Sequence, residues 1–343
     1  MVKAKAKSAV LEIARLAGVS RASAYATLNP GSSGNIGVAE ATRKKILKAA
    51  AKVGYVKNEL ATSLSTGRTN TIGVCVQSLR NHFFCGFSSV LDSLAYADGY
   101  SVLLSSAEYD RDTELRNIKS FLSKKVDALA IAYVSPESLS SMLPQIKDGG
   151  AELVSIGDFR FTGIPSVYFD EIAAAKLQAL HLWQTGRRKV LHLNAGNSPD
   201  LAVRISSQRF INFAAAWRSL SGEMPEEIKV SNGFYPDPGA VETVAKMAKA
   251  GKLDAVACAA DTLALGLASS LSSAGVRVPD DIAIIGMDDL DCSSDFFVPL
   301  TTIRLPTDKL AQGLWNILKR RLSGEGFNEG VAIQPELVKR KSA

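Results

Sequence analysis

The sequence has no apolar run long enough to cross a bilayer, and its basic start, residues 1–7, is not followed by the sustained apolar segment of an export signal. Its few cysteines are far apart, and their spacing fits neither a metal site nor a small disulfide framework; they are Cys75, Cys85, Cys258 and Cys292. These absences argue against a membrane or exported protein and predict a cytoplasmic one.

The sequence also lacks the short motifs that mark common catalytic sites. It has no glycine-rich phosphate loop, no nucleophile elbow and no cluster of metal-binding histidines. Its three histidines, His82, His181 and His192, are isolated from one another. We therefore predict a protein that is not an enzyme and that uses neither a metal nor another cofactor.

Positive charge is present in excess and is unevenly distributed. Residues 1–68 contain twelve Lys or Arg and three acidic residues, a net charge of +9, whereas the remainder carries a net charge of −3. A small basic segment on a slightly acidic body is typical of a nucleic-acid-binding domain joined to a second domain. A solvated lysine-rich tail would give the same numbers, so charge alone does not decide between the two.

Residues near the start have the pattern of two short helices joined by a tight turn. Residues 10–16 show helical apolar spacing, and Gly18 allows a turn conformation that strains other residues. Ser20 is a suitable N-cap for a second helix over 21–28. Such a helix-turn-helix can place its second helix in the major groove of DNA, although similar hairpins occur in other proteins.

The second helix is expected to present small, polar and basic side chains to DNA. These are Ser20, Arg21, Ala22, Ser23, Tyr25 and Ala26. Arg21 suits a guanine edge or a phosphate, and Ser23 and Tyr25 can donate to phosphate or base. A third helix over 41–53, basic on its polar side, completes the expected head.

The order of short motifs over residues 9–68 resembles the head and hinge of LacI/GalR-type transcriptional regulators. The matching pieces are Glu12-Ile13-Ala14, Ala17-Gly18-Val19-Ser20, Leu28-Asn29, Thr42-Arg43, Gly54-Tyr55 and Asn58…Ala61…Leu64. The resemblance implies that Asn58, Ala61 and Leu64 belong to a hinge helix that meets the minor groove, with Leu64 as a wedge that kinks the DNA. The alternative is that Leu64 packs into a core.

After residue 69, short β-rich runs alternate with longer amphipathic runs. The expected strands are 72–76, 101–105, 128–132, 153–156, 166–169, 190–193, 255–259 and 282–287. The expected helices are 87–98, 112–124, 172–185, 206–219, 238–250 and 262–274. This alternation is typical of parallel sheets with helices on both faces, and about 270 residues are too many for one lobe. Two α/β lobes with a cleft between them are therefore predicted.

The family resemblance continues through this body in pieces such as Ile72-Gly73-Val74, Gly275-Val276-Arg277-Val278-Pro279 and Gly286-Met287-Asp288-Asp289. It implies an all-α helix-turn-helix head followed by a periplasmic-binding-protein-like sensor of two doubly wound lobes. The implied boundaries are 1–57 for the head, 58–69 for the hinge helix and linker, and 70–343 for effector binding and dimerisation. Within the sensor, the first lobe covers about 70–168 plus 303–327, and the second covers mostly 169–302.

The resemblance also implies an effector site in the cleft. Arg209 matches a family arginine that reaches into the cleft, and Asp288 matches an acidic residue that accepts hydrogen bonds from hydroxyl groups; such a pair suits a polyhydroxylated ligand. Phe83 and Phe84 are expected to form an apolar wall. The alternatives are a surface salt bridge for Arg209 and a turn position for Asp288.

These observations predict a nucleoid-associated transcriptional regulator, most simply a repressor. It is expected to bind a pseudo-palindromic operator as a homodimer or tetramer. It is also expected to respond to a small molecule such as a carbohydrate. Three other classes of protein share parts of this pattern: an enzyme, an exported solute-binding protein, and an architectural DNA protein without a ligand. The first lacks a catalytic motif, the second an export signal, and Arg209 with Asp288 argues against the third. Whether the effector induces or corepresses stays open.

Overall fold

The computed structural model describes residues 2–28, 37–55, 63, 66–132, 136–157, 163–195, 201–231 and 235–343. Their contacts group into two compact units. The first contains Met1–Thr71 with Lys125–Asp127, and the second contains Ile72–Lys124 with Ala128–Ala343. Each unit buries apolar side chains of its own.

Among its described residues, the first unit contains the helices α1 (Val2–Ala17), α2 (Arg21–Leu28) and α3 (Glu40–Val53). The range predicted for the second helix is confirmed, whereas α1 begins earlier than its apolar spacing indicated. Ile13, Ala24 and Ile46, one from each helix, are completely buried against one another. This small core fixes the angle between α1 and α2.

The turn between α1 and α2 has the geometry that the sequence predicts. Gly18 has a φ of 66°, which glycine adopts without strain. The backbone N–H of Ser23 donates to the Oγ of Ser20 over 3.1 Å, so Ser20 caps the start of α2. The two hydroxyl oxygens of Ser20 and Ser23 also lie 2.9 Å apart.

Residues 69 and 70 are held mainly by one aspartate within the same unit. Asp127 accepts hydrogen bonds from the backbone N–H of Thr69 (2.9 Å) and of Asn70 (2.8 Å). The Thr69 hydroxyl donates to the carbonyl of Lys125 over 2.9 Å, and the Asp127 N–H donates to the carbonyl of Thr71 over 2.8 Å. Residues 69–71 are therefore hydrogen-bonded to the turn at residues 125–127.

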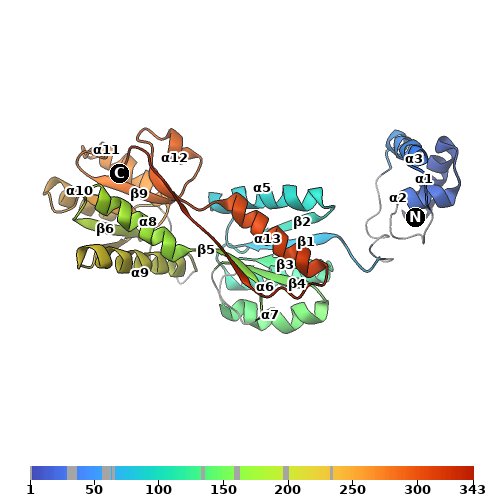
Figure 1. Ribbon diagram of the computed structural model, residues 1–343, viewed down its shortest axis with the longest axis horizontal. Coiled ribbons are helices and arrows are strands. Elements are labelled where there is room, and N and C mark those ends of the chain that lie inside the picture. The colour runs from blue at the N-terminus through green and yellow to red at the C-terminus, as the bar shows by residue number, and fades with distance from the viewer. Residues whose placement is uncertain are drawn as a thin grey trace. The chain divides into compact units, whose positions relative to one another are not determined.

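The second unit is built on two six-stranded sheets (Figure 1). The first has the order β11-β5-β4-β3-β1-β2 and contains β1 (Thr71–Val76), β2 (Ser101–Ser106), β3 (Ala128–Ile131), β4 (Glu152–Ile156), β5 (Ser166–Phe169) and β11 (Gly330–Ile333). The second has the order β12-β10-β9-β8-β6-β7 and contains β6 (Val190–Asn194), β7 (Glu226–Lys229), β8 (Ala255–Cys258), β9 (Ala283–Asp288), β10 (Thr301–Arg304) and β12 (Glu336–Val338). Neighbouring strands pair in parallel at the centre of each sheet, and β12 is antiparallel to β10.

Helices cover both faces of each sheet. The first lobe adds α5 (His82–Ala97), α6 (Arg111–Ser123), α7 (Pro136–Gly149) and α13 (Thr307–Leu322) to the first sheet. The second lobe adds α8 (Glu171–Gln184), α9 (Leu201–Ser221), α10 (Pro238–Lys249), α11 (Asp261–Ser273) and α12 (Cys292–Asp295) to the second sheet. In the first lobe α5 packs with α13 and α6 with α7, and in the second α8 packs with α9 and α10 with α11.

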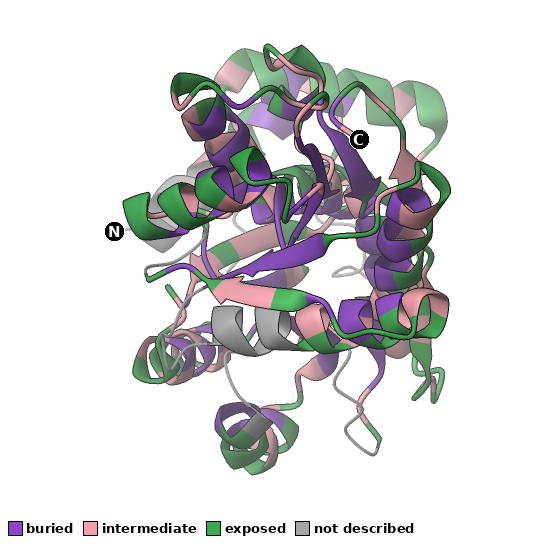
Figure 2. Cartoon of the chain, turned by 90° about the vertical axis from the view of Figure 1, so that its left-hand side faces the viewer, coloured by how far each residue is buried: buried purple, intermediate pink, exposed green. Residues whose placement is uncertain are grey.

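Successive side chains of the central strands point alternately to two faces, and both faces are covered by helices. Ala283, Ile285 and Met287 belong to the core cluster that includes α8 and α9 residues, whereas Ile282 and Ile284 belong to the cluster under α10 and α11. Figure 2 shows buried residues in the strands and on the inner sides of the helices. Strands covered on both faces read as continuous apolar runs, which is why the sequence predicts them well.

All eight predicted strands are present, but four others were missed, and they move the predicted lobe boundaries. The strands β7, β10, β11 and β12 are short, and β7 and β11 are partly exposed. Residues 303–304 still belong to the second sheet through β10, so the return to the first lobe begins after them. The chain then places β11 in the first sheet and β12 in the second, which the predicted segment 303–327 did not include.

One close approach in the first lobe gives a stability prediction. A Cβ added at Gly73 on β1 would lie 2.7 Å from Cγ of Phe121 and 2.9 Å from Cδ2 of Leu129. Gly73→Ala is expected to lower the free energy of unfolding by about 1–3 kcal/mol through overpacking. The midpoint of urea unfolding measures this loss. At Gly326 an added Cβ meets nothing within 4 Å, so Gly326→Ala is the control, and equal effects of the two substitutions would contradict the packing argument.

Candidate functional site

The site predicted around Arg209 lies at the carboxyl end of the second sheet. Arg209 is on α9, Asp288 ends β9, and Ala259 follows β8. Because β8 and β9 are parallel neighbours, their carboxyl ends lie side by side. The carboxyl ends of strands in open α/β sheets are where ligands usually bind.

The guanidinium of Arg209 is held on three sides. Its Nε and Nη2 each donate over 3.1 Å to one of the two carboxylate oxygens of Glu171, the first residue of α8. Its Nη1 donates over 2.6 Å to the carbonyl of Ala259 and lies 3.5 Å from Oδ1 of Asp288. The structure thus brings Arg209 and Asp288 together and adds Glu171, which the sequence analysis missed.

A tight turn aims two successive carboxylates in different directions. Asp288 and Asp289 have φ values of 121° and 58°, a conformation that non-glycine residues seldom adopt. Asp288 meets Arg209, while Asp289 pairs with Arg304 and Arg340, each over 2.7 Å. Strained backbone that separates two neighbouring side chains is common at ligand sites.

A fully buried aspartate holds this turn in place. Asp261, the first residue of α11, accepts hydrogen bonds from the backbone N–H of Leu290 (3.0 Å) and from the hydroxyls of Ser293 (2.6 Å) and Thr302 (2.6 Å). Burial raises the pKa of Asp261, although these hydrogen bonds oppose the shift. The carboxylate therefore ties the loop after β9 to β10.

The pKa values of Asp288 and Arg209, the two side chains predicted to bind the effector, are shifted by both burial and neighbouring charges. Burial raises the pKa of Asp288 to about 7, with the charge of Arg209 opposing the shift and those of Asp261 and Glu171 adding to it. Burial works to lower the pKa of Arg209, but the charges of Glu171 and Asp288 and their hydrogen bonds raise it above its ordinary value. Arg209 therefore stays charged, and Asp288 holds a proton more readily than an ordinary aspartate does.

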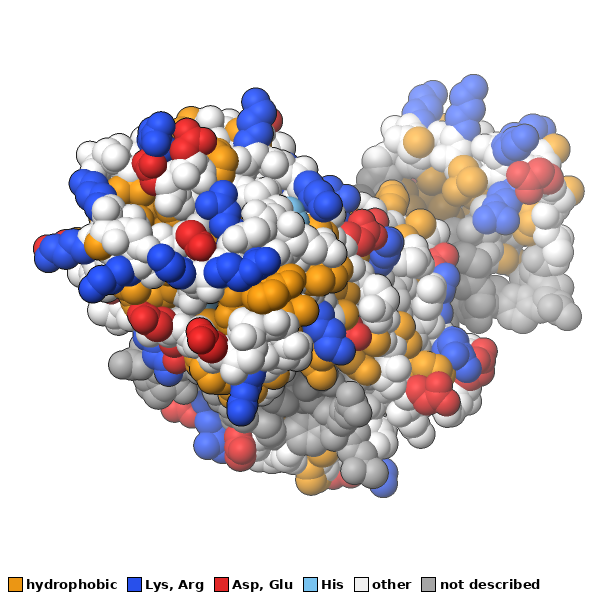
Figure 3. All heavy atoms as spheres, turned by 60° about the vertical axis from the view of Figure 1, so that its left-hand side comes forward, with side chains coloured by type: hydrophobic (Ala, Val, Ile, Leu, Met, Phe, Trp, Pro, Cys, Tyr) orange, Lys and Arg blue, Asp and Glu red, His pale blue; other side chains and the backbone are white. Residues whose placement is uncertain are grey.

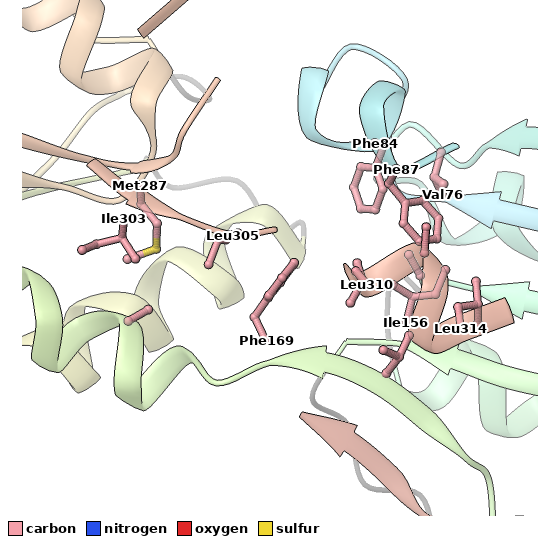
Figure 4. Packing of buried hydrophobic residues seen from close by; sticks show 14 of the residues in the cluster. Val76, Phe84, Phe87, Ile156, Phe169, Met287, Ile303, Leu305, Leu310 and Leu314 are labelled. Atoms are coloured by element: carbon pink, nitrogen blue, oxygen red, sulfur yellow. The ribbon is translucent and has the colours of Figure 1, made fainter. Parts of the chain in front are cut away.

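Of the two phenylalanines predicted as an apolar wall, only one is available for that role. Phe84 is 5% exposed and packs in the core of the first lobe beside Phe87 and Leu310, as Figure 4 shows. Helical spacing explains the error, because successive residues of α5 point to different sides. Phe83 is half-buried, and its ring lies 5.7 Å from that of Phe169 at the end of β5, two residues before Glu171.

In the first unit, α2 has a buried side and an exposed side. Ala24 and Leu28 are buried, Arg21, Ala22 and Tyr25 are exposed, and the predicted readers Ser23 and Ala26 are half-buried. The predicted hinge residues Asn58, Ala61 and Leu64 lie outside the described residues.

In the part of the chain that the structure describes, no helix has the length and apolar character needed to cross a membrane. The same residues include no group of three or more His, Cys, Asp or Glu side chains arranged to hold a metal ion. The described residues thus form a two-lobed α/β unit with a charged cluster at the carboxyl end of its second sheet, and a separate helical unit.

Comparisons with known proteins agree with this architecture. A model of the periplasmic binding protein-like domain matches residues 179–343. The chain is 27% identical to the HTH-type transcriptional repressor PurR of Mannheimia succiniciproducens over 348 residues, which cover 97% of this chain and 98% of that protein.

Two crystal structures of the Lac repressor have a similar fold at 23% identity. One, bound to ONPG in the repressed state, gives a TM-score of 0.81 and covers 97% of this chain and 98% of its own. The other, a dimer bound to operator and the anti-inducer ONPF, gives 0.79 and covers 96% and 97%. The chain is therefore similar over nearly its whole length to PurR-type repressors, and its fold is similar to that of the Lac repressor.

A buried histidine beside this site gives a pH prediction. His192 on β6 is completely buried between Phe210 and Phe213, and neither ring nitrogen has a hydrogen-bond partner among the described residues. Burial, together with the charge of Arg209, lowers its pKa from 6.5 to about 3. The unfolded chain therefore takes up a proton below pH 6.5 that the folded chain refuses, so stability falls as the pH drops from 6.5 towards 3.

Replacing this histidine removes that loss. Between pH 7 and pH 5 the parent protein is expected to lose about 2 kcal/mol more unfolding free energy than His192→Phe, measured by urea unfolding. His82→Phe, which alters an exposed histidine, is the control. Equal pH dependence of the parent and His192→Phe would show that His192 does not account for the acid sensitivity.

Proposed function

We propose that this protein is a sequence-specific DNA-binding transcriptional repressor whose affinity for its operator is set by a small-molecule effector. The proposal rests on two sites in two units: the exposed side of α2, and the cluster of Arg209, Glu171 and Asp288 at the end of the second sheet. The full-length relative is itself a transcriptional repressor, and one of the similar structures contains operator DNA.

The observation that carries DNA binding is the way α2 is presented. Packing of Ala24 and Leu28 fixes one side of α2, so Arg21 and Tyr25 project from the other. A helix whose first turn carries such side chains can enter the major groove, where an arginine reads guanine and small residues meet thymine methyls. We therefore propose that α1 and α2 form the helix-turn-helix and that Ser20, Arg21, Ala22, Ser23, Tyr25 and Ala26 face DNA.

The effector is proposed to bind at Arg209 and Asp288, with Phe83 as an apolar contact. The carboxylate of Asp288 offers acceptor positions beside the charged Arg209, which suit a hydroxyl-rich molecule such as a carbohydrate. A ligand that binds one arrangement of the lobes more tightly shifts the protein towards it and so changes DNA affinity.

A homodimer is proposed because two heads are needed to read a pseudo-palindromic operator of two half-sites.

Figure 3 shows basic and acidic side chains interspersed over a face of the second lobe, so this face has no single-sign field to attract DNA. The net charge of +9 in residues 1–68 assigns that attraction to the head.

The test begins with selection of bound fragments from genomic DNA, which gives the operator. Arg21→Ala is then expected to weaken binding to that operator by about 5- to 150-fold, because one arginine contact to a base edge contributes about 1–3 kcal/mol. Fluorescence anisotropy at several salt concentrations measures the affinity. If Arg21 meets a phosphate instead, the loss is similar for all sequences and the salt dependence becomes shallower.

Arg116→Ala is the matched control, because it removes one exposed positive charge from α6 in the sensor. It is expected to leave operator affinity unchanged. If Arg21→Ala bound the selected operator as tightly as Arg116→Ala does, the assignment of α2 as the reading helix would be wrong.

A further inference from the structure

The donors of Arg209 are almost fully used by the protein itself. A guanidinium has five N–H donors, and those of Arg209 that face Glu171, Ala259 and Asp288 account for four of them. Glu171 takes the pair formed by Nε and Nη2, which is the fork that would bind a phosphate or carboxylate group of a ligand. An anionic ligand can reach this fork only by displacing Glu171.

The charges of the cluster also disfavour an anion. One guanidinium faces the carboxylates of Glu171 and Asp288, so the three side chains together are not positive in either protonation state of Asp288. The arginines Arg304 and Arg340 are held by Asp289. The side chains of Glu171, Arg209 and Asp288 are 22%, 11% and 12% exposed, so this pairing is shielded from water and is little screened by salt.

The unused hydrogen-bonding capacity of the cluster is on the acceptor side. Each carboxylate has about four lone-pair positions, and Glu171 and Asp288 use only part of theirs on Arg209. A ligand that donates hydrogen bonds, through hydroxyl or ammonium groups, can bind these oxygens without breaking the ion pairs. A phosphate or carboxylate brings only acceptors and a further negative charge.

We propose that Glu171 is the specificity-determining residue of the effector site: by occupying the fork of Arg209, it restricts the effector to uncharged hydroxyl-rich or amino-bearing molecules and excludes phosphorylated and carboxylated ones. This inference rests on the proposed function, because it assumes that Arg209 and Asp288 bind the effector. Glu171 would then do more than link the start of α8 to Arg209 on α9.

The sharpest test uses inorganic phosphate as a probe of the fork, since it needs no knowledge of the effector. Glu171→Gln leaves a neutral side chain of the same size that can accept only one of the two hydrogen bonds. The variant is expected to bind phosphate at least about tenfold more tightly than the parent, as one charge-assisted hydrogen bond would give. Thermal unfolding in potassium phosphate, against potassium chloride of equal ionic strength, measures the binding.

Two further variants separate the fork from a general change in charge. Glu242→Gln also removes one carboxylate that pairs with a cation, Lys246, but it lies on the exposed side of α10, and it is expected to respond to phosphate as the parent does. In the double variant Glu171→Gln/Arg209→Gln the gained phosphate response is expected to disappear. A merely structural role of Glu171 would give lower stability without any gain in phosphate binding.

The proposal is overturned if folded Glu171→Gln gains no phosphate response, or if Glu242→Gln gains the same one. It is also overturned, whether or not Glu171→Gln folds, if the parent itself binds phosphate saturably and Arg209→Gln abolishes that binding. Operator binding of the parent is measured separately. Loss of operator binding with an intact phosphate result would therefore refute the proposed function while leaving the assignment of the fork standing.

Discussion

A buried guanidinium must be met by carboxylates or carbonyls, because an unpaired charge in a protein interior is very costly. Arg209 meets this constraint with groups from three other elements: the start of α8, the end of β8 and the end of β9. Because α8 and α9 pack on each other and on the second sheet, the position of both helices is tied to these contacts. The same contacts decide which atoms remain for a ligand.

The fold was predictable where burial of a strand or helix produces a recognisable pattern of apolar residues in the sequence. The central strands β1, β3, β8 and β9 are covered on both faces, so they appear as uninterrupted apolar runs bounded by polar turns. The missed strands are short, and β7 reads Glu-Glu-Ile-Lys, with no run to recognise. Their pairing is decided by neighbours far away in the chain, as when β12 returns to lie against β10.

The site was predictable only in part, and for a different reason. Arg209 and Asp288 matched positions of a family pattern, but nothing in a single sequence shows that Glu171 reaches Arg209 across 38 positions. An acidic residue at the start of a helix is ordinarily explained by its favourable interaction with the helix dipole. Phe83 and Phe84 are adjacent and chemically identical, so only the packing of α5 against α13 distinguishes the core residue from the candidate contact.

The use of charge differs between the two units, and this difference allows one chain to serve two partners. In the second unit the largely buried Arg209, Arg321 and Arg340 have carboxylate partners, so their charges are largely cancelled within the fold. Helix α3 of the first unit instead has one glutamate and five basic side chains, whose field extends into solvent. A polyanion is therefore attracted to the first unit, while the buried charges of the second are paired and give little long-range attraction.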